Sequence, residues 1–464
     1  MKTRLIAGIS LLAHPLAGIA YEKPDIIYIL ADDLGFADVG FNGSDIQTPN
    51  LDRIARQGVQ LNNYYVCPVS SPTRAGLMTG RYPIHFGMMR AVVKPDLNFG
   101  VDTNEEMLPE MLAKAGYDYR GAFGKWHLGH HQTKWLPHNR GFTQFIGCYN
   151  GAIDYFKKTR NKTPDWHHNG KPLKEAGYST DLIGQHTVEF IESVPKDKPY
   201  FAYVAFNAPH APFDAKPEDI AKYPNIEDKK KRYAAMVDCM DQNIGKILEA
   251  AEKRGNLDNT FIVFSSDNGG VKAIANNGLM RSGKTYTYEG GIRVAACAMW
   301  EKGGITGGKI IRERMGYIDM FPTFKHVAYN GKKMPKAKNP LDGENVLDLM
   351  KGKKRTKDRI WFSYLDYDSK TKTERLGVNY GDWKLVVMRP APDNNKPGVA
   401  TVCELFKLDD KNQEVTVVEN KEMEAKLLKS LEEFLSDNKQ KKQVGRSGDG
   451  IKGFKPEPDW EPTR

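Results

Sequence analysis

Four apolar, β-rich runs dominate the hydrophobic pattern of the chain, and each is followed by polar loop residues and then by a helical pattern. The runs are DIIYIL at 25–30, YDYRGAF at 117–123, YFAYVAF at 200–206 and TFIVFSS at 260–266. Strands that alternate with helices are typical of an α/β fold. In open α/β sheets, ligands bind beyond the carboxyl ends of the strands. We therefore expect the residues that follow these runs to form one site.

Polar side chains suited to binding or catalysis follow every run: Asp32, Asp33, Lys125, His127, His210, Asp267 and Asn268. The Asp and Asn side chains offer oxygen ligands, which suit Ca²⁺ or Mg²⁺ rather than zinc. Lys125 and His127 flank a single residue, so in an extended segment their side chains point the same way. The alternative is that the acidic pair forms an ordinary turn or helix cap and that the loop His and Lys residues are exposed.

Two helical segments can be delimited from their patterns. Thr103 and Glu106 form a capping-box pattern ahead of a helix within residues 107–117. Residues 232–255 predict an amphipathic helix whose apolar face carries Met236, Met240, Ile244, Leu248 and Ala251. The preceding KKKR at 229–232 is interpreted as a solvated helix start, because a nucleic-acid patch would carry interleaved aromatic residues.

A change of composition near Gly331 predicts a boundary between two domains. The segment that starts there is rich in Lys, Gly and Pro, as connectors often are. Strand-like runs at 359–365, 377–388 and 403–409 follow, and then an amphipathic helix with Met423, Leu427, Leu431 and Leu435 in register. We predict a catalytic domain at 21–340 and a smaller domain at 341–464 with antiparallel strands, one helix and a polar tail.

The first twenty residues have the pattern of an export signal. Lys2 and Arg4 precede an apolar run that is too short to span a bilayer, and the small residues Gly18 and Ala20 follow it. The alternative is a buried first strand. We predict a signal peptide at 1–20 and a periplasmic or secreted protein that is not an integral membrane protein.

The composition describes a folded chain with a basic surplus. Of its 464 residues, 40% are apolar and 27% are charged, which excludes a disordered or fibrous protein. The net charge of +10 at pH 7 raises the local concentration of anionic partners. The five cysteines are scattered without a CxxC pair, so no zinc or redox centre of that type is indicated. Cys239 and Cys297 have apolar neighbours and are predicted to lie in the core.

The segment CPVSSPTRAGLMTGRYP at 67–83 concentrates nucleophiles and cations at the start of a helical run. Pro72 suits the first turn of a helix. Ser70 then lies where free backbone N–H groups and the helix dipole stabilise an anion. Arg74, one turn later, is placed to hold an oxygen of residue 70. The simpler alternative is that Ser70 is a helix N-cap.

The part SSPTRAGLMTGR of this segment resembles the signature of the formylglycine-dependent sulfatase family, in which Cys or Ser is followed by any residue, then Pro, Ser or Thr, and Arg. Five further blocks resemble the family in the expected order, namely ADDLGFADVG, GKWHLG, NAPHAPF, SDNGG and RSGKTYTYEGGIRV. GRYPIHFGM, GKWHLGHHQTKWLPHNRGF and MGYIDMFPT are most similar to arylsulfatase B-type, N-acetylgalactosamine-sulfatase-like enzymes. The resemblance covers most of residues 24–330. It implies an alkaline-phosphatase-like α/β sandwich with a large mixed, mostly parallel sheet between helices, and a smaller C-terminal α+β domain.

The resemblance also implies roles for single residues. A sulfatase-maturating enzyme would read the Pro-Thr-Arg sequence after Ser71 and oxidise Ser70 to formylglycine, the nucleophile. One Ca²⁺, with Mg²⁺ less favoured, would be bound by Asp32, Asp33, Asp267, Asn268 and an oxygen of residue 70. Lys125 and Lys284 would hold the sulfate oxygens, and Arg74 the nucleophile. His127 and His210 would transfer protons.

The implied activity is that of a sulfatase acting on a sulfated carbohydrate, either a glycosaminoglycan or an algal galactan such as carrageenan. The basic surplus agrees with a polyanionic substrate. Arg90, Lys94, His138 and Arg140 lie in loops near the matched blocks and are candidates for selecting the sugar. Their alternative is that they are solvated loop charges.

Two other functions are weighed against this hypothesis. A phosphomonoester or phosphodiester hydrolase of the alkaline-phosphatase-like superfamily would share the Asp clusters. It would use an unmodified Ser or Thr, and commonly two zinc ions with more His ligands. A non-catalytic polyanion-binding protein would keep the Lys and Arg residues and lose the acidic groups and the nucleophile, whereas both sets are present here.

Overall fold

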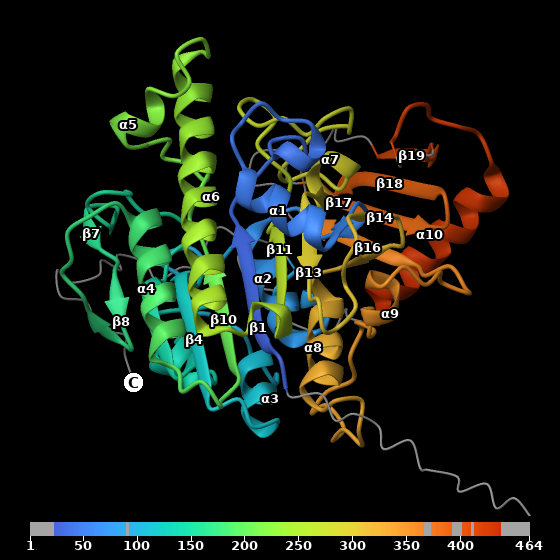
Figure 1. Ribbon diagram of the computed structural model, residues 1–464. Helices are drawn as coiled ribbons and strands as arrows, with labels where there is room; N and C mark the ends of the chain where they lie inside the picture. The colour runs from blue at the N-terminus through green and yellow to red at the C-terminus, as the bar shows by residue number, and fades with distance from the viewer. Residues whose placement is uncertain (1–22, 90–91, 366–372, 392–400, 410–412, 438–464) are drawn as a thin grey trace, which may run out of the picture.

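A ten-stranded mixed sheet forms the centre of the computed structural model, which describes residues 23–89, 92–365, 373–391, 401–409 and 413–437 (Figure 1). The strand order is β14-β2-β13-β11-β1-β10-β4-β5-β8-β9. Strands β11, β1, β10, β4 and β5 are parallel, while β13 and β8 join them antiparallel. The bounds are β1 Asp25–Ala31, β2 Val59–Leu61, β4 Tyr119–Lys125, β5 Gln144–Cys148, β8 His167–His168, β9 Lys171–Pro172, β10 Tyr200–Ala205, β11 Thr260–Ser266, β13 Ala296–Met299 and β14 Lys309–Ile311.

Helices cover both faces of this sheet because its central strands are apolar on both sides. All seven residues of β1 are buried, as expected for a parallel strand between two helix layers. Tyr28 belongs to a hydrophobic cluster with α2 Ser70–Thr79, α3 Leu108–Lys114 and α8 Met320–Ala328. Ile27 and Ile29 belong to a second cluster with α1 Pro49–Gln57, α4 Ser179–Ser193 and α6 Asp228–Arg254. The predicted α/β sandwich with a large mixed, mostly parallel sheet between helices is confirmed, and its parallel strands lie at the centre.

Short elements complete this part of the chain. Strands β3 Tyr64–Tyr65, β12 Arg293–Val294 and β15 Met315–Gly316 form a three-stranded sheet, and β6 Thr159–Arg160 pairs with β7 Thr163–Pro164. The short helices are α5 Pro217–Ile220, α7 Glu289–Ile292 and α9 Leu347–Met350.

Two predicted element starts differ from the observed ones. Helix α3 begins at Leu108, and Glu110 rather than Glu106 accepts the N–H of its cap residue, Met107, at 2.8 Å. The capping box predicted at Thr103 is therefore wrong, and Pro109, which suits a first helical turn, agrees with the later start. The strand predicted at 117–123 begins at Tyr119, because the N–H of Tyr117 still donates to Leu112 O at the end of α3.

The long amphipathic helix is confirmed as α6, and it starts at Asp228, four residues earlier than its apolar pattern. Lys229 and Lys230 are exposed in its first turn and Lys231 is partly exposed, which agrees with the interpretation as a solvated helix start.

A four-stranded antiparallel sheet follows in the order β16-β17-β18-β19. Its strands are β16 Trp361–Leu365, β17 Thr373–Tyr380, β18 Trp383–Pro390 and β19 Val402–Lys407, and α10 Lys421–Ser436 comes after them. The run predicted at 377–388 is divided by a turn at Gly381, whose φ of 55° suits glycine. Leu427 and Leu431 of α10 lie in the same hydrophobic cluster as Tyr28. The division of the chain at residue 340 stays a prediction.

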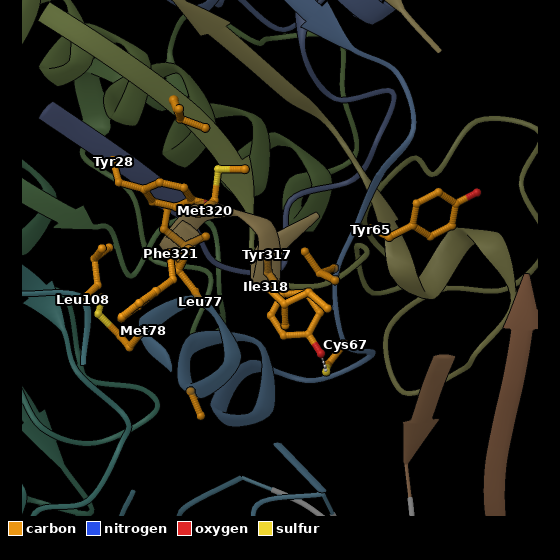
Figure 2. Packing of buried hydrophobic residues seen from close by; sticks show 14 of the residues in the cluster. Tyr28, Tyr65, Cys67, Leu77, Met78, Leu108, Tyr317, Ile318, Met320 and Phe321 are labelled. Atoms are coloured by element: carbon orange, nitrogen blue, oxygen red, sulfur yellow. Dashed lines mark hydrogen bonds between the residues drawn. The ribbon is translucent and has the colours of Figure 1, made fainter. Parts of the chain in front are cut away.

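Helix α2, which carries Ser70, is held by tight apolar packing. Leu77 and Met78 lie among Met320, Phe321 and Tyr28 beneath the sheet (Figure 2). All five side chains are buried, so the position of α2 relative to β1 is fixed by the core.

The two cysteines that were predicted to lie in the core are buried there. Cys239 and Cys297 lie in the core cluster between α6 and the sheet. Cys67 donates from Sγ to the hydroxyl of Tyr317 at 3.1 Å (Figure 2), and burial raises its pKa to about 12. Its thiol is therefore neutral and not a nucleophile at neutral pH.

The predicted signal peptide at 1–20, the polar tail and Arg90 lie outside the described residues. Within the described part of the chain, none of the helices has both the length and the apolar character that crossing a bilayer requires.

Candidate active site

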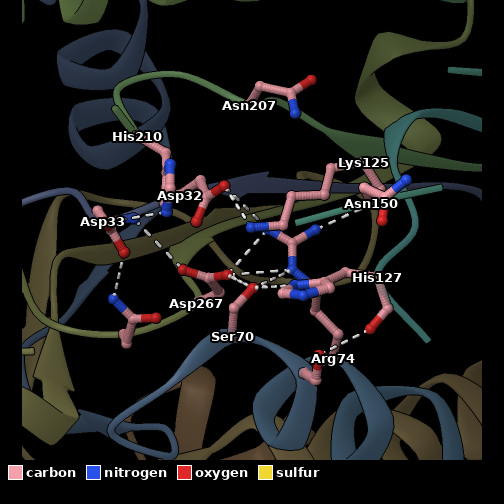
Figure 3. Close-up of polar contacts among 12 residues, drawn as sticks. Asp32, Asp33, Ser70, Arg74, Lys125, His127, Asn150, Asn207, His210 and Asp267 are labelled. Carbon is pink, nitrogen blue, oxygen red and sulfur yellow. Dashed lines mark hydrogen bonds and ion pairs between the residues drawn. The ribbon is translucent and has the colours of Figure 1, made fainter. Parts of the chain in front are cut away.

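The carboxyl ends of β11, β1, β10 and β4 are adjacent, and the predicted site residues gather at this edge (Figure 3). These strand ends deliver Asp32, Asp33, Lys125, His127, His210, Asp267 and Asn268. Asp33 and Asn268 are 235 positions apart in the chain, yet Asn268 Nδ2 donates to Asp33 Oδ1 at 2.7 Å. The parallel pairing of the strands is what brings them together.

Ser70 is the first residue of α2, and its side chain does not cap the helix. The N-cap is the extended residue Val69, and no side-chain cap hydrogen bond is present there. The hydroxyl of Ser70 instead donates to Asp267 Oδ2 at 2.5 Å, and Ser70 is 1% exposed. The N-cap alternative for Ser70 is therefore wrong, and its oxygen points at the strand ends (Figure 3).

Arg74 links Ser70 to the acidic groups. Its spacing of four residues places it on the same helix face as Ser70, and its Nε donates to Ser70 Oγ at 2.9 Å. Its second nitrogen, Nη2, donates to Asp267 Oδ2 at 2.9 Å, and Nη1 donates to Lys125 O at 3.1 Å. Burial alone would raise the pKa of Asp267, but the charges of Arg74 and Lys125 outweigh it and lower that pKa below its usual range. Asp267 is thus a carboxylate in this site.

Lys125 and Asp32 form a fully buried ion pair. Lys125 Nζ lies 2.5 Å from Asp32 Oδ2, and both side chains are 0% exposed. Burial raises the pKa of Asp32, and the nearby Asp267 charge adds to this effect. Burial lowers the pKa of Lys125. The ammonium group is therefore held by the pair at a point where solvent cannot reach it.

Lys284 makes a similar ion pair with Asp33. Its Nζ lies 2.5 Å from Asp33 Oδ1. Burial alone would raise the pKa of Asp33, but the charges of Lys284 and His210 hold it well below its usual range. Asp33 has a φ of 65°, uncommon for a residue other than glycine, and such strain is often kept at functional sites.

The acidic group fits a hard divalent cation. Asp32 Oδ1 and Asn268 Oδ1 are buried and have no hydrogen-bond partner. A buried acceptor without a partner costs about 1–3 kcal/mol, and a cation bound between these oxygens would remove that cost. One ligand atom each from Asp32, Asp33 and His210 also lie within 4.8 Å of one another. Carboxylate and amide oxygens are the ligands that Ca²⁺ and Mg²⁺ prefer.

His127 faces the hydroxyl of Ser70. Its Nδ1 lies 3.2 Å from Ser70 Oγ, and its Nε2 lies 3.1 Å from Val93 O. A carbonyl only accepts, so Nε2 carries the proton and Nδ1 is left as an acceptor. Burial lowers the pKa of His127 well below its usual range, and the charges of Lys125 and Arg74 act in the same direction. The imidazole is therefore neutral, and its unprotonated Nδ1 faces Ser70 Oγ.

Two small residues fix the position of His127. The hydroxyl of Ser71 donates to His127 O at 2.8 Å and accepts from the N–H of Val93 at 3.0 Å. Gly151 lies flat against the ring, because a Cβ there would be 2.4 Å from His127 Cε1. His127 has a φ of 60°, so these contacts hold it in an uncommon backbone conformation.

His210 lies on the other side of the acidic group. Its Nε2 is 3.6 Å from Asp33 Oδ2, and its Nδ1 is 2.6 Å from Ala211 O. The side chain is 22% exposed, whereas those of Lys125, Asp32 and Arg74 are 0% exposed. His210 therefore stands between the buried charges and solvent.

Sequence reasoning did not assign a role to Ser71, Asn150 or Asn207. Asn150 follows β5 and Asn207 follows β10, and both are buried around the site (Figure 3). Asn150 Oδ1 has no hydrogen-bond partner. The strand-end rule that found Asp32 applies to Asn207 and would apply to Asn150, but the β5 run was not recognised as a strand.

The sugar-selecting candidates separate into different environments. Arg140 is 2% exposed and donates to Val101 O at 3.0 Å and Glu105 O at 2.8 Å, so both interpretations of this residue, sugar contact and solvated charge, are wrong. Lys94 is exposed and follows Val93, whose carbonyl meets His127. His138 is partly buried beside Gly170, away from the strand ends.

Comparison with known proteins identifies the family of this site. Residues 24–330 match the sulfatase family. The chain belongs to the sulfatase family. Arylsulfatase J of Mus musculus is 32% identical over 390 residues, which are 81% of this chain and 64% of that protein. N-acetylgalactosamine-6-sulfatase of Homo sapiens is 34% identical over 374 residues, which are 74% of this chain and 69% of that protein. The chain thus spans less than two thirds of arylsulfatase J and slightly more than two thirds of the second relative.

A solved structure agrees over nearly the whole sulfatase chain. The crystal structure of Ps i-CgsB in complex with k-i-k-neocarrahexaose superposes with a TM-score of 0.81 at 35% identity, covering 92% of this chain and 95% of that chain. The resemblance stated from the signature segment and the ordered blocks is therefore confirmed at the level of family and fold.

Proposed function

We propose that this protein hydrolyses sulfate esters on a sulfated carbohydrate, with a formylglycine made from Ser70 as its nucleophile. The observation that carries the proposal is the surrounding of Ser70 Oγ. Asp267 Oδ2 lies at 2.5 Å, Arg74 Nε at 2.9 Å and His127 Nδ1 at 3.2 Å, at the start of a helix. A hydroxyl at that point has a cation, a base and free backbone N–H groups around it.

The nucleophile requires a maturation step. Ser70, with Pro72, Thr73 and Arg74 after it, fits the sequence that a sulfatase-maturating enzyme oxidises. The hydrated aldehyde supplies a second hydroxyl on the same carbon. Ser70 is buried in the folded chain, so we propose that this partner acts before folding is complete.

A calcium ion is proposed for the acidic group, held by Asp32, Asp33, Asp267 and Asn268, with an oxygen of residue 70 beside them. When bound, the ion supplies positive charge next to the sulfate ester. The two orphaned oxygens, Asp32 Oδ1 and Asn268 Oδ1, support this assignment. Mg²⁺ is the less favoured ion, because it demands a near-ideal octahedral set.

Lys125 and Lys284 are proposed to bind the sulfate oxygens. Each ammonium lies 2.5 Å from a carboxylate of the acidic group, Lys125 from Asp32 and Lys284 from Asp33. A sulfate monoester carries its charge on peripheral oxygens, and fixed ammonium groups neutralise the charge that repels a nucleophile. Their ion pairs pre-organise them for this task.

The two histidines are proposed to move protons at different atoms. His127 Nδ1 faces the oxygen of residue 70 and is neutral, so it would take a proton from a hydroxyl there. His210 lies on the solvent side, where the sugar would leave, and would protonate the ester oxygen of the sugar. A sugar alkoxide is a poor leaving group and needs that proton.

For the substrate, we propose an algal galactan such as carrageenan, with a glycosaminoglycan as the second candidate. The match to Ps i-CgsB, a protein solved with k-i-k-neocarrahexaose, extends over 92% of this chain. The match to N-acetylgalactosamine-6-sulfatase covers 74% of this chain, and the name of that protein supports the second candidate. The net charge of +10 suits either polyanion. The export pattern of residues 1–20 supports a periplasmic or secreted location, where such polymers are met.

The decisive test combines mass analysis with sulfate release. Protein produced together with a maturating enzyme should show the loss of two hydrogens, located at Ser70 by peptide mass spectrometry. That form should release sulfate from a carrageenan oligosaccharide or a chondroitin sulfate oligosaccharide, and Ser70→Ala should not. An unmodified Ser70 in a form that hydrolyses 4-nitrophenyl phosphate instead would overturn the proposal in favour of phosphoryl transfer.

A further inference from the structure

The loop that carries Lys284 is fastened to the C-terminal sheet. We use the name Lys284 loop for residues 282–288. The hydroxyl of Thr287 in this loop donates to Leu376 O of β17 at 3.0 Å. Gly377 allows this approach, since a Cβ there would lie 3.3 Å from both the Cβ and the carbonyl oxygen of Thr287. Strand β17 therefore runs against the backbone of the Lys284 loop.

Arg375 of β17 makes the most specific contact to this loop. Its Nη1 donates to Thr285 O at 2.7 Å and to Thr285 Oγ1 at 3.0 Å. Its guanidinium carbon lies 3.9 Å from the centre of the Tyr286 ring, in the geometry of a cation–π contact. Arg375 is 5% exposed, so these contacts are shielded from water. A planar guanidinium held by stacking and by two hydrogen bonds has a fixed orientation.

Thr285 has a strained backbone conformation, which the contacts of Arg375 can hold in place. Its φ is 74°, a conformation that is a genuine outlier for a β-branched residue. A residue held in this region costs about 1–3 kcal/mol and persists only when its surroundings determine it. The N–H of Thr285 donates to Pro68 O at 2.8 Å. Thr285 thus connects the segment that precedes Ser70, the neighbouring Lys284 and Arg375 of the C-terminal sheet.

The far end of the loop is anchored separately. Glu289, at the start of α7, is paired with Lys384 of β18 at 2.7 Å, and the hydroxyl of Tyr65 donates to it at 2.7 Å. Glu289 and Lys384 are both fully buried. Because this anchor follows Tyr288, it leaves the turn at Lys284 and Thr285 to be held by Arg375 and by the backbone contacts to Pro68 and Gly270.

We propose that Arg375 is a positioning residue for Lys284. It holds the strained Thr285 so that the ammonium group next to it in sequence stays 2.5 Å from Asp33 Oδ1. The C-terminal sheet then supports the catalytic apparatus through Arg375. This inference rests on the proposed function, in which Lys284 binds a sulfate oxygen.

The test is a double-mutant cycle between Arg375 and Lys284, measured with 4-nitrophenyl sulfate on the matured full chain. Arg375→Ala is expected to lower kcat/KM roughly 10- to 100-fold, since a misplacement of about 1 Å at a reacting centre has effects of that size. In the Lys284→Ala background, Arg375→Ala should cost less than about 2-fold, because two changes that act through one group are not additive. Arg375→Lys, which keeps the charge but not the planar fork, should recover part of the loss.

Arg389→Ala is the matched control. Arg389 lies on β18 of the same sheet and pairs with Glu374 and with Glu432 of α10, not with the Lys284 loop. Its removal should leave kcat/KM within about 2-fold of wild type. Thermal unfolding of every variant checks that the compared proteins are folded. If Arg375→Ala does not fold, Arg375→Lys takes its place in the cycle.

Hydrogen exchange supplies a readout that does not depend on activity. Amides of residues 282–288 should exchange faster in Arg375→Ala than in wild type and should be unchanged in Arg389→Ala. Equal losses of kcat/KM in both backgrounds, or unchanged exchange in the loop, would overturn the positioning role. A matured wild type that releases sulfate from neither oligosaccharide, carrageenan or chondroitin sulfate, nor from 4-nitrophenyl sulfate would overturn the proposed function. The exchange comparison would still decide whether Arg375 holds the loop.

Discussion

His127 Nδ1 and Ser70 Oγ lie 3.2 Å apart, although the two residues are separated by 57 positions in the chain and come from a strand end and a helix start. The two ring nitrogens have different roles, because Nε2 donates its proton to Val93 O at 3.1 Å. The nitrogen that faces residue 70 is therefore the one without a proton. This polarity supports the proposed role of His127 as a base toward position 70.

His127→Ala should slow turnover on sugar sulfates and aryl sulfates alike, by about 10²- to 10⁴-fold, as expected for loss of a general base. The loss is independent of the leaving group because the proton that His127 takes belongs to the nucleophile. Sulfate release from a carrageenan oligosaccharide and nitrophenol release from 4-nitrophenyl sulfate are the measurements. His186→Ala is the control, since His186 pairs with Glu175 and Glu189 and not with the site. A loss confined to the sugar substrate would contradict the role.

His210→Ala should show the opposite selectivity. A sugar oxygen needs a proton as it leaves, whereas a nitrophenolate leaves without one, so the loss should be about 10²-fold or more on the sugar sulfate and much smaller on 4-nitrophenyl sulfate. The ratio of kcat/KM on the two substrates, compared between wild type and variant, measures this difference. Equal losses on both substrates would show that His210 is not the acid.

Gly151→Ala should impair catalysis more than stability. The added Cβ would lie 2.4 Å from His127 Cε1, so the ring must move from the oxygen of residue 70. We expect kcat to fall roughly 10²-fold, the effect of a misplacement of about 1 Å. Gly43→Ala is a useful comparison, because an added Cβ there meets nothing within 4 Å, so only stability should change through its φ of 91°. Full activity of Gly151→Ala would mean that the ring has room to adjust.

Metal removal should lower the thermal midpoint of unfolding. A cation that binds only the folded chain stabilises it in proportion to the logarithm of its concentration over Kd. Chelation should lower the midpoint of wild type, and added Ca²⁺ should restore it better than Zn²⁺, because the carboxylate and amide ligands are oxygens. Asn268→Leu removes one orphaned oxygen and should make the midpoint insensitive to chelator. Stoichiometric zinc in the purified protein would contradict the assignment.

Salt should weaken activity on a polymer more than on a small substrate. A net charge of +10 attracts a sulfated polysaccharide over distances that salt screens, with a Debye length of about 10 Å at 0.1 M. We expect kcat/KM on polymeric carrageenan to fall as NaCl rises from about 0.05 to 0.5 M, because the Debye length shortens severalfold over this range. The value on 4-nitrophenyl sulfate should change little, which controls for effects of salt on the site itself. A parallel fall on both would remove the argument from surface charge.

Much of the site could be predicted from strand ends. Asp32, Lys125 and Asp267 follow apolar runs, and parallel strands place their carboxyl ends at one edge. Asn150 was missed because its strand, β5, is only five residues long and its run was not read as a strand. The predicted starts of α3 and β4 differ from the observed starts by one or a few residues, because local turn and capping contacts determine where these elements begin.

The sequence by itself determined the α/β class, the edge at which the site lies and, through the signature segment, the family. These properties depend on local periodicity and on residues close together in the chain, which a sequence displays directly. Only the tertiary structure decided the contacts between distant residues. The hydroxyl of Ser70 points at Asp267 instead of capping its own helix, Arg140 is buried instead of facing a sugar, and Arg375 reaches Thr285 across 90 positions. Such contacts are set by which buried faces pack together, and no local pattern encodes that choice.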